Sequence, residues 1–270
     1  MNRRQLCLAL AAAAAAAGLP WGAAAEVSSA LAAAVAGPGR SQKNRVRDPW
    51  RHPAATLAFW GLAPGMTVVE IDPSGGYWTE IIAPYLKATG GRYIAAVGGD
   101  AGPAFKAKYA DAGIWGAVEV VPFGEHAGVL ATPGSADMVL TARNIHDWMW
   151  TPGELTDHLA AFHAALKPAA ILAVEEHRAD PRPQIDDAHD GYVATAWLEA
   201  AVEKAGFRLD GASEINANPR DDKNHPFGVW TLPPTRRTHE KSKPTPAGFD
   251  PAKYEAVGES DRMTLRFRKT

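Results

Sequence analysis

The feature that most constrains the fold is the alternation of short β-rich runs with helical segments between residues 66 and 215. The run 170–174 has no polar residue, which is typical of a strand covered on both faces of a sheet. Strands are predicted at 66–71, 92–97, 117–121, 136–140, 170–174 and 207–215, and helices at 77–86, 103–112, 154–166 and 193–205. This order predicts an α/β fold with a doubly wound, mostly parallel, Rossmann-like sheet.

One further strand is expected at the C-terminus. Met263, Leu265 and Phe267 alternate with polar residues, the period-two pattern of a half-exposed strand. Only irregular sequence separates this strand from the one before it, so we expect it to lie antiparallel in the sheet. The intervening segment 233–258 is polar and rich in proline and lysine, and its length is typical of a lid or a mobile connector.

The first 25 residues have the composition of an export signal. Arg3 and Arg4 precede an apolar, alanine-rich run, and an Ala-Ala-Ala sequence at 23–25 forms a cleavage site before Glu26. We therefore expect the mature protein to be exported to the periplasm. The paired arginines match the twin-arginine export signal in part, which leaves that route open. The mature chain is then a helical segment at 26–60, with helices at 27–36 and from Pro53 onward, followed by the sheet domain at 61–270.

Composition excludes several kinds of site. The one cysteine, Cys7, lies in the signal, so the mature chain has no disulfide, no cysteine zinc ligand and no cysteine nucleophile. Two of the 28 basic residues also lie there, so 26 basic residues stand against 30 acidic ones, a net charge of −4. With this charge balance we expect no nucleic-acid partner. The mature chain also has no basic amphipathic stretch, so stable membrane insertion after cleavage is not expected. A small molecule is the expected ligand.

The position of a binding site follows from the predicted sheet. In such sheets ligands bind outside the carboxyl ends of the strands, where strand order reverses. After the first strand come the small residues Ser74, Gly75 and Gly76, followed by the start of a helix whose free N–H groups favour polar or anionic groups. Taken alone, such a loop also serves as a tight strand-to-helix turn.

The chain resembles class I S-adenosylmethionine-dependent methyltransferases, and specifically a bacterial family of exported predicted methyltransferases. The first part of the resemblance consists of Arg47-Asp48, Arg51-His52-Pro53, Phe59-Trp60-Gly61-Leu62, the run 64–71, Gly75-Gly76-Tyr77-Trp78-Thr79-Glu80-Ile81 and Ala83-Pro84-Tyr85-Leu86. The rest consists of Asn144-Ile145-His146-Asp147-Trp148, Glu176-His177-Arg178, Ile215-Asn216-Ala217-Asn218-Pro219 and Gly258-Glu259-Ser260-Asp261-Arg262. The resemblance implies S-adenosylmethionine as cofactor and methyl transfer to a small-molecule acceptor.

The resemblance also implies which residues bind the cofactor. In the family's first motif, an acid followed by three alternating glycines, Glu70 and Gly76 match, whereas Asp72 and Ser74 replace the first two glycines. An acid after the second strand, here Asp100, would hold the ribose, and Glu125 falls where the fold often contacts adenine. The complete expected set is Glu70, Asp72, Ser74, Gly75, Gly76, Asp100, Glu125 and Asn144.

His146 is the expected catalytic residue. It follows the fourth strand, on the methyl-transfer side of this fold, and histidine titrates near working pH as a general base must. Asp147 is expected to orient it. The alternative is a structural histidine hydrogen-bonded at the end of a strand.

A metal is not expected. His177 with Glu175 and Glu176 reaches the same rim, and His189 lies in an acidic run with Asp186, Asp187 and Asp190 that has the ligand types of a hard cation. However, acidic loop runs are commonly solvated, and no two histidines have helical ligand spacing.

A second function stays open from the sequence alone. The altered glycine loop, together with export to a compartment where S-adenosylmethionine is not made, fits a non-catalytic binding protein that kept a degenerate methyltransferase fold.

Overall fold

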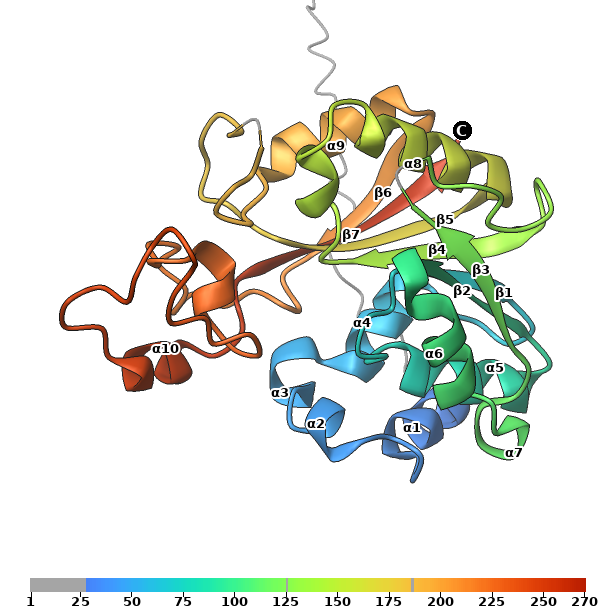
Figure 1. Cartoon of the computed structure of the whole chain (residues 1–270). Coiled ribbons are helices and arrows are strands. Elements are labelled where there is room, and N and C mark those ends of the chain that lie inside the picture. Colours follow the sequence, from blue (N-terminus) through green and yellow to red (C-terminus); the bar gives the residue numbers. More distant parts are fainter. Residues whose placement is uncertain (1–27, 125, 186) are drawn as a thin grey trace, which may run out of the picture.

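The computed structural model describes residues 28–124, 126–185 and 187–270. The predicted signal 1–25, Glu125 and Asp186 lie outside the described residues. Seven strands form one sheet in the order β3-β2-β1-β4-β5-β7-β6 (Figure 1). Their bounds are β1 Thr67–Ile71, β2 Arg92–Gly98, β3 Val118–Phe123, β4 Ala136–Ala142, β5 Leu166–His177, β6 Phe207–Ser213 and β7 Arg262–Lys269. Strands β1 to β5 pair in parallel, and β7 runs antiparallel to β5 and β6. The predicted fold class is confirmed.

Helices cover both faces of the sheet (Figure 1). Helices α8 (Glu154–Ala165) and α9 (Thr195–Lys204) pack with one face of β1, β4 and β5. The other face is covered by α1 (Ser29–Ala36), α4 (Pro53–Trp60), α5 (Thr79–Thr89), α6 (Gly102–Lys108) and α7 (Ala112–Trp115). Adjacent side chains of β1 pack on opposite faces of the sheet, since Val68 belongs to one core and Val69 to the other. The central strands are therefore apolar on both faces.

The N-terminal segment forms more helices than the sequence predicts. Two short helices, α2 (Gln42–Arg45) and α3 (Asp48–Arg51), precede α4. His52 separates α3 from α4 with a left-handed backbone (φ 39°), and Pro53 takes the first position of α4, where its missing N–H costs no hydrogen bond. Figure 1 shows these helices below the sheet, on the side of α5 and α6. The predicted helix 103–112 is likewise divided, because α7 begins anew at the capping side chain of Asp111.

Two predicted strands differ in the structure. β5 extends to His177 instead of stopping near 174, and its last residues stay buried because they pair with β7. The expectation that β7 is half-exposed holds only in its second half, where Arg266 and Arg268 are partly exposed and Phe267 is buried. The polar residues Arg262 and Thr264 are buried as fully as their apolar neighbours, since β7 lies between β5 and β6 rather than at the edge of the sheet.

A lobe after β6 projects from the sheet domain (Figure 1). It contains a short 3-10 helix, Gly228–Thr231, and the helix α10 (Pro251–Val257), which falls inside the segment predicted as a long polar loop. Asn218 ties the lobe together, since its side-chain amide donates to the carbonyls of Val257 and Glu259. None of the helices among the described residues has the length and apolar character needed to cross a membrane.

Candidate functional site

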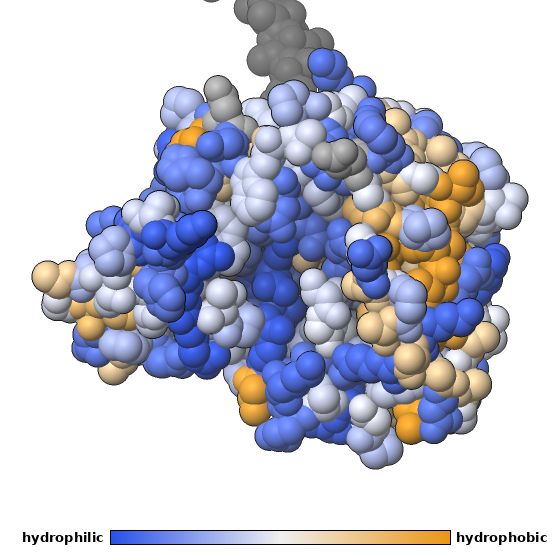
Figure 2. Space-filling model, viewed as in Figure 1, coloured by the Kyte–Doolittle hydropathy of each residue, from blue (hydrophilic) through white to orange (hydrophobic). Residues whose placement is uncertain are grey.

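A cavity opens at the carboxyl ends of the central strands, where the topology predicts a ligand. Its volume is about 170 Å³, more than ten times the roughly 10–15 Å³ that one water molecule requires. Figure 2 shows a hydrophilic recess between the C-terminal lobe and the sheet domain. The lining comes from the exits of β1, β4 and β5, from α3 and from the lobe. It consists of Arg51, Glu70 to Ser74, Tyr77, Trp78, Ala142 to Asn144, His146, Asp147, His177, Val229, Trp230, Pro233 to Thr235, Glu259 and Ser260.

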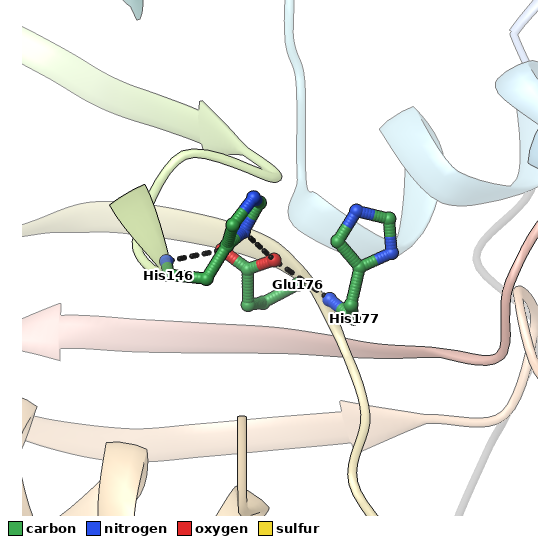
Figure 3. Close-up of side chains that lie close together, drawn as sticks. All are labelled: His146, Glu176 and His177. Carbon is green, nitrogen blue, oxygen red and sulfur yellow. Dashed lines mark hydrogen bonds and ion pairs between the residues drawn. The ribbon is translucent and has the colours of Figure 1, made fainter. Parts of the chain in front are cut away.

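Figure 3 shows a buried histidine–carboxylate pair at this cavity. His146 Nδ1 lies 2.9 Å from Glu176 Oε1, so the carboxylate accepts a hydrogen bond from Nδ1–H and leaves Nε2 as the reactive nitrogen. The backbone N–H groups of Ile145 and His177 also donate to Glu176, at 2.7 and 2.8 Å. His177 stacks obliquely on His146, with ring centroids 5.1 Å apart. Glu176 therefore fixes both the position and the tautomer of His146.

The two histidines of the site have opposite pKa shifts. Burial lowers the pKa of His146, but the charge and hydrogen bond of Glu176 outweigh it, so the net shift is upward. Burial and the nearby positive groups, His146 first, lower the pKa of His177 well below its usual value. His146 is therefore the proton acceptor of the pair, and His177 is a neutral neighbour.

Asp147 contacts His146 at the nitrogen opposite the one that Glu176 holds. Its Oδ1 lies 3.4 Å from His146 Nε2, and its side chain is half-exposed at the cavity. Glu176 makes the shorter contact, at 2.9 Å, because the parallel strands β4 and β5 bring residues 146 and 176 together. Asp147 instead borders the space in front of Nε2.

The first loop keeps a glycine-like backbone without its glycines. Asp72 and Ser74, at the two replaced positions, have φ values of 41° and 48°, in the left-handed region that glycine favours. The Asp72 carboxylate accepts a hydrogen bond from the N–H of Gly98 at 2.7 Å and so links the ends of β1 and β2. Burial raises the pKa of Asp72 to about 6. The substitutions therefore preserve the course of the loop.

Glu70 belongs to the interior below this loop. Its carboxylate accepts hydrogen bonds from the hydroxyls of Tyr93 at 2.5 Å and Thr79 at 3.0 Å. Burial raises the pKa of Glu70 to about 7, because these two bonds compensate only part of the lost hydration. Glu70 lines the cavity while it ties β1 to β2 and α5.

Gly75 and Gly76 lie outside the cavity lining, so their predicted contact with a cofactor stays a prediction. Gly76 has φ 79°, and a Cβ added there would lie 1.7 Å from the hydroxyl of buried Tyr109. We expect Gly76→Val to lower the free energy of unfolding by about 3 kcal/mol, through left-handed strain and overlap with Tyr109. Urea denaturation measures this loss.

Gly75→Ala is the matched control for Gly76→Val. An added Cβ at Gly75 has no atom within 4 Å, and the backbone there is not left-handed. Its effect should stay within about 0.5 kcal/mol. Equal stability of the two variants would contradict the packing role of Gly76.

The remaining predicted cofactor residues are divided. Asn144 lines the cavity, and its side-chain amide donates to the Ile71 carbonyl at 2.9 Å, joining the exits of β4 and β1. Asp100 is exposed in the 3-10 helix Gly99–Ala101 and does not line the cavity. Glu125 lies outside the described residues. Among the described residues, the lining includes none from β2 or β3, so the cavity is concentrated over β1, β4 and β5.

Several lining residues were not predicted from the sequence as site residues. Glu259, Ser260 and Trp230 come from the lobe, and Arg51 and Arg143 bring positive charge. Arg51 and Glu259 form an ion pair of 2.9 Å across 208 residues of chain. Such separations leave no local pattern in a sequence. The one available signal was that both residues belong to motifs shared with the resembling family.

Metal binding has a weak basis in this geometry. His146, Glu176 and His177 have the types and proximity of a metal triad. However, both Glu176 oxygens already accept two hydrogen bonds each, from the His146 ring and three backbone N–H groups. His177 Nδ1 is hydrogen-bonded to the Ser260 hydroxyl. Of the predicted acidic run, Asp187 and His189 are exposed and hydrogen-bonded to each other.

No protein-family model and no curated protein matches this sequence. Solved structures do match. A methyltransferase from Aquifex aeolicus described as SAM-dependent (S-adenosylmethionine-dependent) is 21% identical, with a TM-score of 0.50 over 65% of this chain and 92% of its own. A candidate sarcosine dimethylglycine methyltransferase from Galdieria sulphuraria is 12% identical, with a TM-score of 0.55 over 84% and 85%. The cyclase SpnF is 14% identical, with a TM-score of 0.54 over 88% and 91%. The chain has the class I methyltransferase fold.

Proposed function

We propose that this protein transfers a methyl group from S-adenosylmethionine to a small-molecule acceptor, with His146 as the general base. The observation that carries the proposal is the His146–Glu176 pair, which faces the cavity at the carboxyl edge of a class I methyltransferase sheet. A buried histidine held by a carboxylate, with its second nitrogen at a ligand-sized cavity, is the arrangement of a proton acceptor.

The residues at the exits of β1 and β4 fit the cofactor. Asp72, Ser74 and Gly76 of the loop have left-handed backbones, and Asn144 links the exits of the two strands. Asp72, Ser74 and Asn144 would hold it. When bound, S-adenosylmethionine supplies an electrophilic methyl group and leaves as S-adenosylhomocysteine.

The chain's own residues act on the acceptor. An acceptor placed before His146 Nε2 loses its proton to that nitrogen, and Glu176 stabilises the imidazolium that results. Asp147 lies 3.4 Å from the same nitrogen and offers a second carboxylate to the developing positive charge. Trp230, with its ring centroid 5.8 Å from that of His146, shields the site on the side of the lobe.

The test of function is transfer of an isotopically labelled methyl group. Mature protein is incubated with methyl-labelled S-adenosylmethionine and a small-molecule extract, and labelled products are sought by mass spectrometry. Product formed by the wild type and not by His146→Ala supports the proposal. Label that appears equally with both proteins contradicts the role of His146.

A second candidate is a non-catalytic small-molecule-binding protein. Two observations favour it. The cavity lies mainly over β1, β4 and β5. At position 72, where the resembling family has a glycine, this chain has an aspartate whose carboxylate accepts a hydrogen bond from Gly98. The fold also supports other chemistry, since the similar structure SpnF is described as a cyclase. Binding of a ligand without any turnover would identify this candidate.

We also propose export, on the basis of residues 1–25. The mature protein should begin at Glu26, directly after the small residues of the cleavage site. Intact-mass measurement of protein recovered from the envelope of the producing cell checks this expectation. Recovery of a species that retains residues 1–25 would contradict it.

A further inference from the structure

A buried cluster of arginines lies beside the cavity. Glu259 accepts ion pairs from Arg47 at 2.6 Å, Arg51 at 2.9 Å and Arg262 at 3.1 Å. Arg262 also pairs with Glu175 at 2.5 Å. These three arginines thus share two carboxylates. Arg51 is only 1% exposed, and its Nη2 has no hydrogen-bond partner although the residue lines the cavity.

Arg143 adds a fourth positive charge. It follows β4 with a left-handed backbone (φ 62°), and its N–H donates to the Glu175 carbonyl at 2.8 Å. Its Nε has no hydrogen-bond partner, and within the described part of the chain its guanidinium forms no ion pair. Burial, Arg51 and Arg47 lower the pKa of Arg143 to about 9. The structure therefore holds this charge without a matching anion.

Two neighbouring carboxylates make their contacts with groups other than Arg51 and Arg143. Asp48 is occupied by Arg40 and by the Tyr77 hydroxyl, each at 2.7 Å. Glu176 is occupied by His146 and by backbone N–H groups. Among the described residues, the four arginines form ion pairs with only two carboxylates, Glu175 and Glu259. Asp147 also lines the cavity, but it forms no ion pair with Arg143. A buried charge without a partner is costly, and guanidinium groups pair well with carboxylate and phosphate.

We propose that Arg51 and Arg143 form an anion site in this cavity, which binds a carboxylate or phosphate group of a small-molecule ligand. The inference rests on the proposed function for the identity of that ligand. Two sources carry such a group, an acidic acceptor and the amino-acid end of S-adenosylmethionine. In either case the anion is held at the cavity that contains His146 Nε2 and so fixes how the ligand approaches it.

Thermal unfolding in inorganic phosphate or citrate tests the site without any methyl transfer. The unfolding temperature of the mature protein should rise with anion concentration, beyond the effect of sodium chloride at equal ionic strength. Arg143→Met should lose this response. Without anion it should be at least as stable as the wild type, because an unmatched charge has been removed. Arg208→Met, at an exposed position of β6, should respond as the wild type does.

The proposal is overturned if the wild type shows no response beyond that to sodium chloride, or if Arg143→Met keeps the response.

Titration with S-adenosylhomocysteine and with 5′-methylthioadenosine, which lacks the amino-acid end, then assigns the source of the anion. If Arg143→Met lowers the affinity for S-adenosylhomocysteine tenfold or more and leaves that for 5′-methylthioadenosine unchanged, the anion belongs to the cofactor. Unchanged affinity for both ligands assigns the anion to the acceptor. An equal loss of affinity for both shows that Arg143 only shapes the cavity, which also overturns the proposal. A wild type that binds neither ligand contradicts the proposed function and leaves the phosphate result to decide on the anion site.

Discussion

His146→Ala is expected to lower the turnover number by two to four orders of magnitude, because it removes the general base. Affinity for S-adenosylhomocysteine should stay within a few-fold of the wild type, since His146 acts on the acceptor. The reaction needs neutral His146. Glu176 raises the pKa of this histidine, so the rate should increase as the pH rises through that raised value, above 6.5. Steady-state kinetics against pH, with the ligand titration on the same variant, measures both effects.

Glu176→Gln and His189→Ala complete this experiment. Glu176 is a positioning residue, and its neutral replacement should move the pH profile of the rate to lower pH, since the raising charge is lost. His189 is exposed and does not line the cavity, so its removal should leave turnover unchanged. Full activity in His146→Ala, or a loss of activity that only follows a loss of thermal stability, would end the catalytic assignment.

Glu259→Gln is expected to produce the largest loss of stability. Glu259 is 3% exposed, and its carboxylate is shared by Arg47, Arg51 and Arg262. Removal of its charge leaves these arginines buried with Glu175 alone, which should cost about 3–5 kcal/mol. The unfolding temperature should fall by on the order of 10 °C. Differential scanning calorimetry at neutral pH measures the shift.

The stability that Glu259 contributes should decrease as the pH falls. Burial raises the pKa of Glu259, but the arginines outweigh burial and lower it. The stability from Glu259 is therefore present above the unfolded value of 4.5 and is lost as the pH falls through the lowered pKa. Glu255→Gln is the control, because Glu255 pairs with Arg236 at the surface and should cost no more than about 1 kcal/mol. Equal losses in the two variants would contradict the buried cluster.

The sheet could be predicted from the sequence because its signals are local. The run 170–174 is apolar on both faces, and this pattern depends only on neighbouring residues and on the layers that cover them. The end of β5 escaped prediction for the opposite reason. Glu175, Glu176 and His177 were expected at the rim of the site. Arg262 pairs with Glu175 and His146 donates a hydrogen bond to Glu176, and these partners from other parts of the chain keep the two acids buried.

The site was predicted where topology alone determines it. His146 and Asn144 follow β4, and the carboxyl edge of the sheet brings them to the cavity. Sequence adjacency was the guide to Asp147, which does lie 3.4 Å from His146 Nε2. The hydrogen bond from Nδ1 goes to Glu176 on the neighbouring strand, a contact that adjacency could not indicate. The arginine cluster joins α3 to the lobe, a contact that no periodicity encodes.

Isothermal titration calorimetry of residues 26–270 with S-adenosylhomocysteine tests the central claim most directly. If the loop 72–76 and the β4 exit form a cofactor site, heat should be released with one ligand bound per chain. Replacement of Asn144 by leucine should weaken that binding by about tenfold or more, since the exits of β1 and β4 lose their link. Absence of binding at millimolar ligand, in protein shown to be folded by its thermal transition, would contradict the methyltransferase assignment and favour a fold that has lost its cofactor.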